Sequence, residues 1–173
     1  VESFPLKHRI PSTGFIFREK QGLPNLRKEF IAKYSLSLAE ISSIKNGSDL
    51  TTADGQIIPN ADLTFYSSNP RSYAYCSDTV YSEKLIGMLK DVDLLYHEAT
   101  FASSEEMLAK QTGHSTSAQA AKIALKSGVK KLIIGHFSSR YKSIEPLLID
   151  AKVIFENTTA VEDGDVFEIA LKR

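Results

Sequence analysis

SYAYCSDT, residues 72–79, begins the part of the sequence that decides the fold. The first five residues are typical of a short, mostly buried strand, and the polar Ser-Asp-Thr that follows ends it. Two runs of the same design come later, DLLYHEAT at 93–100 and KKLIIGHFSSR at 130–140. Helix-favouring sequence separates the three runs. Alternating strands and helices of this length predict β-α-β units and a parallel sheet.

Further elements extend this pattern in both directions along the chain. Near the start, partial alternation predicts two strands, at 2–7 and 13–18, joined by a turn. The remaining predicted elements are helices at 82–92, 103–111, 117–128 and 144–156 and strands at 158–162 and 165–172. Together they predict an α/β fold.

The stretch from about residue 20 to residue 60 does not share this pattern. Residues 23–46 are charged and helix-favouring, with Ser37 placed to cap a helix and Gly47 placed to end one. A small hairpin is predicted at Asp54-Gly55. This part has few core residues, and we expect it to form an arm inserted into the domain.

Composition places the chain among soluble globular proteins. It has 173 residues, of which 42% are hydrophobic and 24% charged, enough for one domain. Lys+Arg and Asp+Glu are both 21, so only a local basic patch would attract nucleic acid. No apolar stretch approaches the roughly 20 residues that a bilayer requires. The single cysteine, Cys76, fits a buried core position and a cytoplasmic location.

Residues that could bind a metal or a phosphate follow the ends of the predicted strands, where loops converge in α/β sheets. Asp78 is equally well interpreted as a bridge between two divalent metals and as a cap for the next helix. His136 is a possible zinc ligand, although a lone histidine there is more often structural. Ser138 and Arg140 could bind a phosphate, and a surface salt bridge is the alternative for Arg140.

A second pair of candidates favours proton transfer. Glu98 would orient the ring of His114 and stabilise its cationic form, which makes His114 a candidate general acid. His97 is interpreted as structural, because it points to the face of an extended strand opposite Glu98. The chain has no HxH, HxxEH or CxxC motif, so a complete zinc site built locally is excluded. His8, Asp78 and His136 would leave two metals short of ligands.

Five motifs, in their order and spacing, carry a resemblance to a known family. VESFPLKHRIPSTGFIFRE, CSDT, LLYHEATF, GHSTSAQAA and IIGHFSSRY resemble the second half of ribonuclease Z, the transfer-RNA 3′-processing endonucleases of the metallo-β-lactamase superfamily. The resemblance implies about half of a four-layer αββα sandwich, with an inserted arm that grips transfer RNA. The glycine-proline signature of that arm is missing here.

The resemblance also implies roles for the candidate residues. It makes His8, Asp78 and His136 zinc ligands, His114 and Glu98 the proton-donating pair, and Ser138 with Arg140 the phosphate-contacting segment. These assignments follow from the motif positions alone, and they imply two zinc ions in the intact enzyme.

The implied reaction removes the 3′ trailer of precursor transfer RNA by attack of a metal-activated water, leaving a 3′ hydroxyl. The HxHxDH motif that precedes this region in the family is absent. We therefore expect a missing N-terminal half, an inactive isolated chain and, through the uncovered sheet face, a homodimer. The alternatives are another phosphodiesterase of the superfamily and a non-catalytic RNA-binding or assembly module.

Overall fold

The computed structural model describes residues 1–171 and divides them into two compact units. Val1–Glu19 and Arg71–Ala170 form the first, called the sheet unit below. Lys20–Pro70, together with Leu171, form the second, called the arm unit. Each unit has a hydrophobic cluster of its own.

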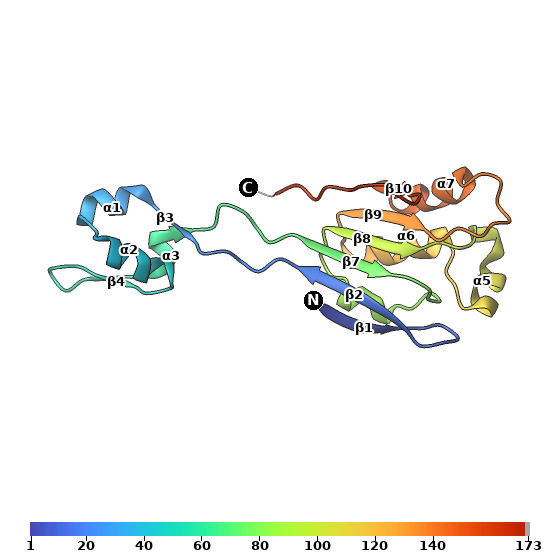
Figure 1. Cartoon of the computed structure of the whole chain (residues 1–173), viewed down its shortest axis with the longest axis horizontal. Helices are drawn as coiled ribbons and strands as arrows, with labels where there is room; N and C mark the ends of the chain where they lie inside the picture. Colours follow the sequence, from blue (N-terminus) through green and yellow to red (C-terminus); the bar gives the residue numbers. More distant parts are fainter. Residues whose placement is uncertain (172–173) are drawn as a thin grey trace. The chain divides into compact units, whose positions relative to one another are not determined.

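Within the described residues, the sheet unit is built on six strands in the order β1-β2-β7-β8-β9-β10 (Figure 1). Strand β2 runs antiparallel to both of its neighbours, and the pairs from β7 to β10 are parallel. The end of β1 therefore lies at the same edge of the sheet as the ends of β7, β8 and β9. The bounds are β1 Glu2–Leu6, β2 Ser12–Arg18, β7 Ser72–Cys76, β8 Leu94–Glu98, β9 Lys131–Gly135 and β10 Thr158–Ala160.

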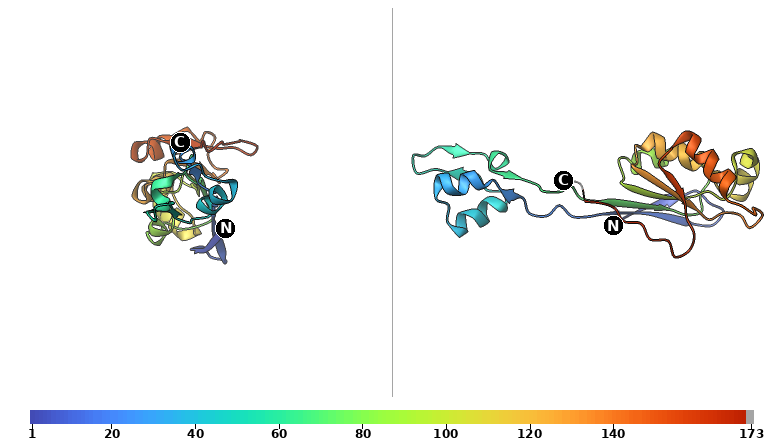
Figure 2. Two further views of the ribbon diagram at one scale, coloured as in Figure 1. Left: turned by 90° about the vertical axis from the view of Figure 1, so that its left-hand side faces the viewer. Right: turned by 90° about the horizontal axis from the view of Figure 1, so that it is seen from above.

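Helices α4 (Lys84–Met88), α6 (Ser117–Ser127) and α7 (Glu145–Ile154) cover one face of this sheet (Figure 2). A short 3-10 turn, η1 (Ser103–Glu105), leads into α5 (Glu106–Thr112). The covered face is apolar because alternate strand residues point into it. Its fully buried members include Ala74, Cys76, Leu95, Leu132 and Ile134.

The opposite face of the sheet carries aromatic side chains. Tyr75 stacks on Tyr96 with ring centroids 4.8 Å apart, and Phe17 stacks on Tyr73 at 5.9 Å. Phe15 and Phe17 keep 38% and 44% of their surface exposed. A sheet with helices on one face supplies two of the four layers expected of the αββα sandwich.

The arm unit has a small mixed structure around its own core. Strands β3 (Asn25–Leu26) and β6 (Thr64–Phe65) pair antiparallel at its base. Between them lie α1 Lys28–Tyr34, α2 Leu38–Lys45, the β4 (Leu50–Thr51) and β5 (Ile57–Ile58) hairpin, and α3 Asn60–Leu63. The buried residues are Leu26, Leu36, Ile44, Leu50 and Leu63. The predicted Ser37 cap is confirmed, because its hydroxyl accepts the Glu40 amide proton and the Glu40 carboxylate accepts the Ser37 amide proton.

Two predicted elements differ from the structure. The predicted helix 82–92 is shorter in the structure, where α4 ends at Met88 and its C-cap Leu89 has a non-helical ψ of 7°. Asp91 has a positive φ of 57°, so the helix does not resume after the cap. The strand predicted at 165–172 is wrong for residues 165–171: the chain leaves the sheet after the Val161 amide donates to the Ile134 carbonyl. Its last residue, Lys172, lies outside the described residues. None of the described helices combines the length and apolar character needed to span a membrane.

The two sheet faces predict different responses to truncation. Ile134→Ala removes a fully buried side chain and should lower the free energy of unfolding by about 2–5 kcal/mol, through lost burial and a cavity. Phe17→Ala, on the half-exposed face, should cost less than about 1.5 kcal/mol. Chemical denaturation of both variants measures this, and equal losses would show that the aromatic face is as well packed as the helical one.

Candidate metal centre

Four strands end at one edge of the sheet, and each is followed by, or ends in, a histidine or a carboxylate. Asp78 lies two residues beyond β7, Glu98 ends β8, and His136 follows β9 directly. His8 lies two residues beyond β1, which runs in the same direction. The predicted convergence at the carboxyl ends of the strands is confirmed for these residues.

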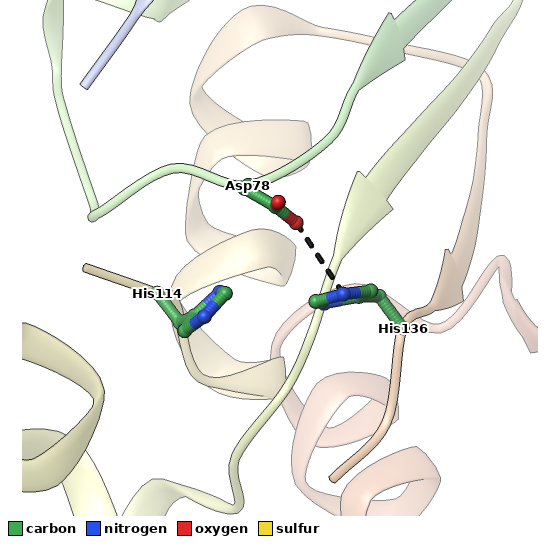
Figure 3. Close-up of side chains that lie close together, drawn as sticks. All are labelled: Asp78, His114 and His136. Atoms are coloured by element: carbon green, nitrogen blue, oxygen red, sulfur yellow. Dashed lines mark ion pairs between the residues drawn. The ribbon is translucent and has the colours of Figure 1, made fainter. Parts of the chain in front are cut away.

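Asp78, His114 and His136 form a compact group of possible metal ligands (Figure 3). One ligand atom from each lies within 4.8 Å of the others, and His136 Nε2 is 3.4 Å from Asp78 Oδ1. The Asp78, His114 and His136 side chains are 34%, 14% and 46% exposed, so the group is open on one side. His136 has a φ of 60°, a left-handed conformation that costs free energy in residues with a Cβ and is frequent at functional sites.

The buried Glu98 carboxylate organises this group. Within residues 1–171 it accepts five hydrogen bonds. Three reach Oε1, from the amides of Thr79 and Ser115 and from His114 Nδ1 at 2.9 Å. Two reach Oε2, from the amide and hydroxyl of Thr100. Because Glu98 is fully buried, these donors replace the water that a carboxylate otherwise needs.

Thr100 connects Glu98 to His136, a role that the sequence analysis missed. Its hydroxyl donates to Glu98 Oε2 at 2.7 Å and lies 3.0 Å from His136 Nδ1. A hydroxyl has one proton, so Thr100 must accept from His136, and that nitrogen carries a hydrogen. His136 Nε2 is then left with a free lone pair facing Asp78. The signal was present, since Thr100 stands two residues after Glu98 at the same strand end.

His114 is held in the same way. Glu98, as a carboxylate, only accepts, so the proton between them belongs to His114 Nδ1 and the free nitrogen is Nε2. The predicted contact between Glu98 and His114 is therefore present. The catalytic use of that contact remains a proposal.

His8 reaches the same edge but stands outside the compact group. Its Nδ1 lies 2.8 Å from the carbonyl oxygen of Gly113, and its ring centroid is 5.0 Å from that of His114. Gly113 has a φ of 90°, and a Cβ there would lie 2.7 Å from His8 Nδ1. Only glycine fits beside His8 in this conformation. As Gly113 occupies Nδ1, His8 Nε2 is the nitrogen left for a ligand.

His97 and Cys76 are core residues, as interpreted from the sequence. His97 is fully buried, and its Nδ1 lies 2.7 Å from the backbone carbonyl oxygen of Glu98. Its Nε2 is buried with no hydrogen-bond partner among the described residues. Burial lowers the pKa of His97 and raises the pKa of the Cys76 thiol to about 12. Cys76 is therefore an unreactive thiol.

Arg140 forms a salt bridge with Glu105, which was the predicted alternative to phosphate binding. Its Nη1 donates to both carboxylate oxygens of Glu105, at 3.0 and 3.1 Å, and its guanidinium lies over the Phe101 ring. The Tyr141 hydroxyl also donates to Glu105. Ser138 is half-buried, and its amide donates to the Thr100 carbonyl. A phosphate contact by Ser138 and Arg140 stays a prediction.

The donor set fits a divalent metal of the zinc type. Two imidazole nitrogens and a carboxylate oxygen are ligands that zinc takes in proteins, and the Thr100 contact leaves His136 Nε2 free to bind. Asp78 makes no helix cap, because the first turn of α4 has no side-chain cap. Three donors are one short of a tetrahedral zinc site, so further ligands are needed.

The sequence of this chain is similar to a known domain family and to named relatives. The β-lactamase superfamily domain family matches residues 39–137. Ribonuclease Z of Phocaeicola vulgatus is 51% identical over 91% of this chain, and ribonuclease Z of Bacteroides thetaiotaomicron is 47% identical over 95%. The aligned regions make up 51% and 52% of those proteins. The chain thus spans about half the length of the curated relatives it matches.

Solved structures agree on the fold. The human short-form tRNase Z aligns with 97% of this chain and 42% of its own, with a TM-score of 0.54 and 24% identity. The metallo-β-lactamase fold protein YhfI from Bacillus subtilis aligns with 57% of this chain and 40% of its own, with a TM-score of 0.53 and 25% identity. The predicted fold class is confirmed.

Thr100→Val should change the tautomer of His136 while leaving all the candidate metal ligands in place. Valine keeps the shape of threonine but cannot accept the His136 proton, so the Nδ1-protonated tautomer should lose population and zinc affinity should fall about 10- to 100-fold. Thr100→Ser keeps the hydroxyl and is the control. Imidazole ¹⁵N shifts report the tautomer and calorimetry the zinc affinity. Unchanged values in the valine variant would exclude this role.

Burial of His97 predicts a pH-dependent stability. In the unfolded chain His97 takes up a proton below its ordinary pKa of about 6.5, whereas in the folded chain its pKa is lower. The unfolded state then binds more protons, so stability falls as pH drops below about 6.5, by at most about 1.4 kcal/mol per pH unit. Denaturation of the wild type and His97→Asn between about pH 5 and about pH 8 should show a shallower slope in the variant.

Proposed function

Because the chain belongs to the β-lactamase superfamily, we propose that it forms the C-terminal part of a zinc-dependent ribonuclease Z. The intact protein would remove the 3′ trailer of precursor transfer RNA and leave a 3′ hydroxyl. Relatives named ribonuclease Z, at 47% and 51% identity, support this substrate. One observation carries the proposal: Asp78, His114 and His136 converge beside a buried carboxylate that orients the His114 imidazole.

The metal ions would be held by Asp78, His136 and His8, which leaves His114, the third member of the compact group, free for proton transfer. When bound, the ions would supply an activated water and neutralise phosphate charge. His114 has the place of a general acid, because Glu98 fixes its Nδ1 proton and leaves Nε2 as the nitrogen that faces the site. From Nε2 it would protonate the departing 3′ oxygen. Thr100 holds His136 in the tautomer that leaves Nε2 free.

The residues present are too few for two zinc ions, which need further ligands. We propose that a preceding half with the HxHxDH motif supplies them, and that this chain alone is inactive. The exposed aromatic face, with Phe15 and Phe17, gives the isolated chain a surface for association as a homodimer. A cytoplasmic location belongs to the same proposal.

The arm unit offers features suited to RNA. A pocket of 540 Å³ is lined by Phe65, by one anion, Glu29, and by three cations, Arg27, Lys28 and Lys45, so its net charge is positive. Arg27 lies over the Phe65 ring, and Phe65 keeps 43% of its surface exposed. In proteins that bind single-stranded RNA, cationic side chains bind the phosphates and exposed aromatic rings stack on the bases. This arrangement supports a substrate-gripping arm despite the missing glycine-proline signature.

A chimera tests the proposed activity directly. The first half of the Phocaeicola vulgatus ribonuclease Z, joined to this chain, should cleave precursor transfer RNA and leave a 3′ hydroxyl. His114→Ala in the chimera should lower the rate about 100-fold or more, because general acid catalysis is lost. End-labelled RNA on a denaturing gel measures both. A folded, zinc-loaded chimera without cleavage would contradict the proposal.

Deleting residues 23–47 from the chimera distinguishes a ribonuclease Z from the two alternatives, a phosphodiesterase for small esters and a non-catalytic RNA-binding module. Precursor cleavage should collapse while hydrolysis of a small phosphodiester, bis(p-nitrophenyl) phosphate, survives, because the catalytic groups lie outside the deletion. A phosphodiesterase specific for small esters would hydrolyse bis(p-nitrophenyl) phosphate with or without the deletion and would not cleave the precursor in either form. A non-catalytic RNA-binding module would bind precursor RNA with or without zinc and hydrolyse neither substrate.

A further inference from the structure

A pocket of 390 Å³ is lined by His114, while Asp78 and His136 take no part in its walls. Those walls come from the end of β1, the loop after β7, and helices α5 and α6. Val80 and Tyr81 form an apolar wall, and Gln119 a polar one. The volume suits one nucleotide, since small-molecule pockets begin at about 300 Å³.

Two lysines give this pocket its charge. Lys7 and Lys110 line it, and neither ammonium group has an ion-pair partner within residues 1–171. Glu106 also lines the pocket, one helical turn before Lys110. Two cations against one anion leave a net positive charge, which favours a phosphate group.

The reaction geometry relates this pocket to the leaving group. In an in-line displacement at phosphorus, the attacking and departing oxygens lie on opposite sides. If His114 protonates the departing 3′ oxygen, the ribose bearing that oxygen must lie within reach of His114. The pocket beside His114 is a space of the right size for that nucleoside.

We infer that this pocket binds the last nucleotide retained on the product RNA, with Lys7 and Lys110 contacting its 5′ phosphate. The inference rests on the proposed function, because that function identifies the 3′ oxygen as the leaving group. Glu106 opposes the same phosphate and weakens its binding.

The test uses the 173-residue chain and adenosine 5′-monophosphate, a nucleotide with a free 3′ hydroxyl. Titration followed by ¹H-¹⁵N NMR should shift the signals of Lys110 and His114. Binding should weaken about fivefold or more in Lys7→Gln/Lys110→Gln, because two charge-assisted contacts are lost. It should tighten in Glu106→Gln. The control Lys122→Gln/Lys152→Gln removes two exposed lysines outside the pocket and should match the wild type.

Equal affinities in the wild type and Lys7→Gln/Lys110→Gln would overturn the inference, as would shifts confined to other surfaces or no saturable binding. A parallel titration with precursor transfer RNA keeps the two proposals apart. If the chain binds that RNA but the nucleotide shows no lysine dependence, the subsite is wrong and the proposed function stands. If it binds neither, the subsite is overturned and the proposed function loses support.

Discussion

The candidate site depends on one buried carboxylate. Glu98 accepts hydrogen bonds from the loop after β7, from its own strand end and from the segment before α6. Each donor would be left unsatisfied if the carboxylate were removed, and the carboxylate would be costly to bury without them. The same contacts that hold three chain segments together therefore orient His114 and, through Thr100, His136.

Strand direction explains why distant residues meet around this carboxylate. The antiparallel β2 lies between β1 and β7, so β1 runs with the parallel strands and brings His8 to their carboxyl edge. The helices occupy one sheet face and leave aromatic rings on the other. The covered face supplies stability, and the strand ends supply the chemistry.

Local charge matters more here than total charge. The chain is formally neutral, yet Lys7 and Lys110 share a pocket and Arg27, Lys28 and Lys45 share another. A neutral protein can attract a polyanion at such places, because charges farther away than about 10 Å are largely screened. Arg140 contributes less, since Glu105 already pairs with its guanidinium.

The sequence by itself determined the order of most strands and helices, the Ser37 cap and the gathering of Asp78, Glu98 and His136, because these follow from local patterns and strand polarity. Only the tertiary structure decided that Thr100 joins Glu98 to His136, that Glu105 pairs with Arg140, and that residues 165–171 form no strand. These outcomes depend on contacts between residues far apart in the chain. Periodicity and turn chemistry describe neighbours along the chain and carry no information about such partners.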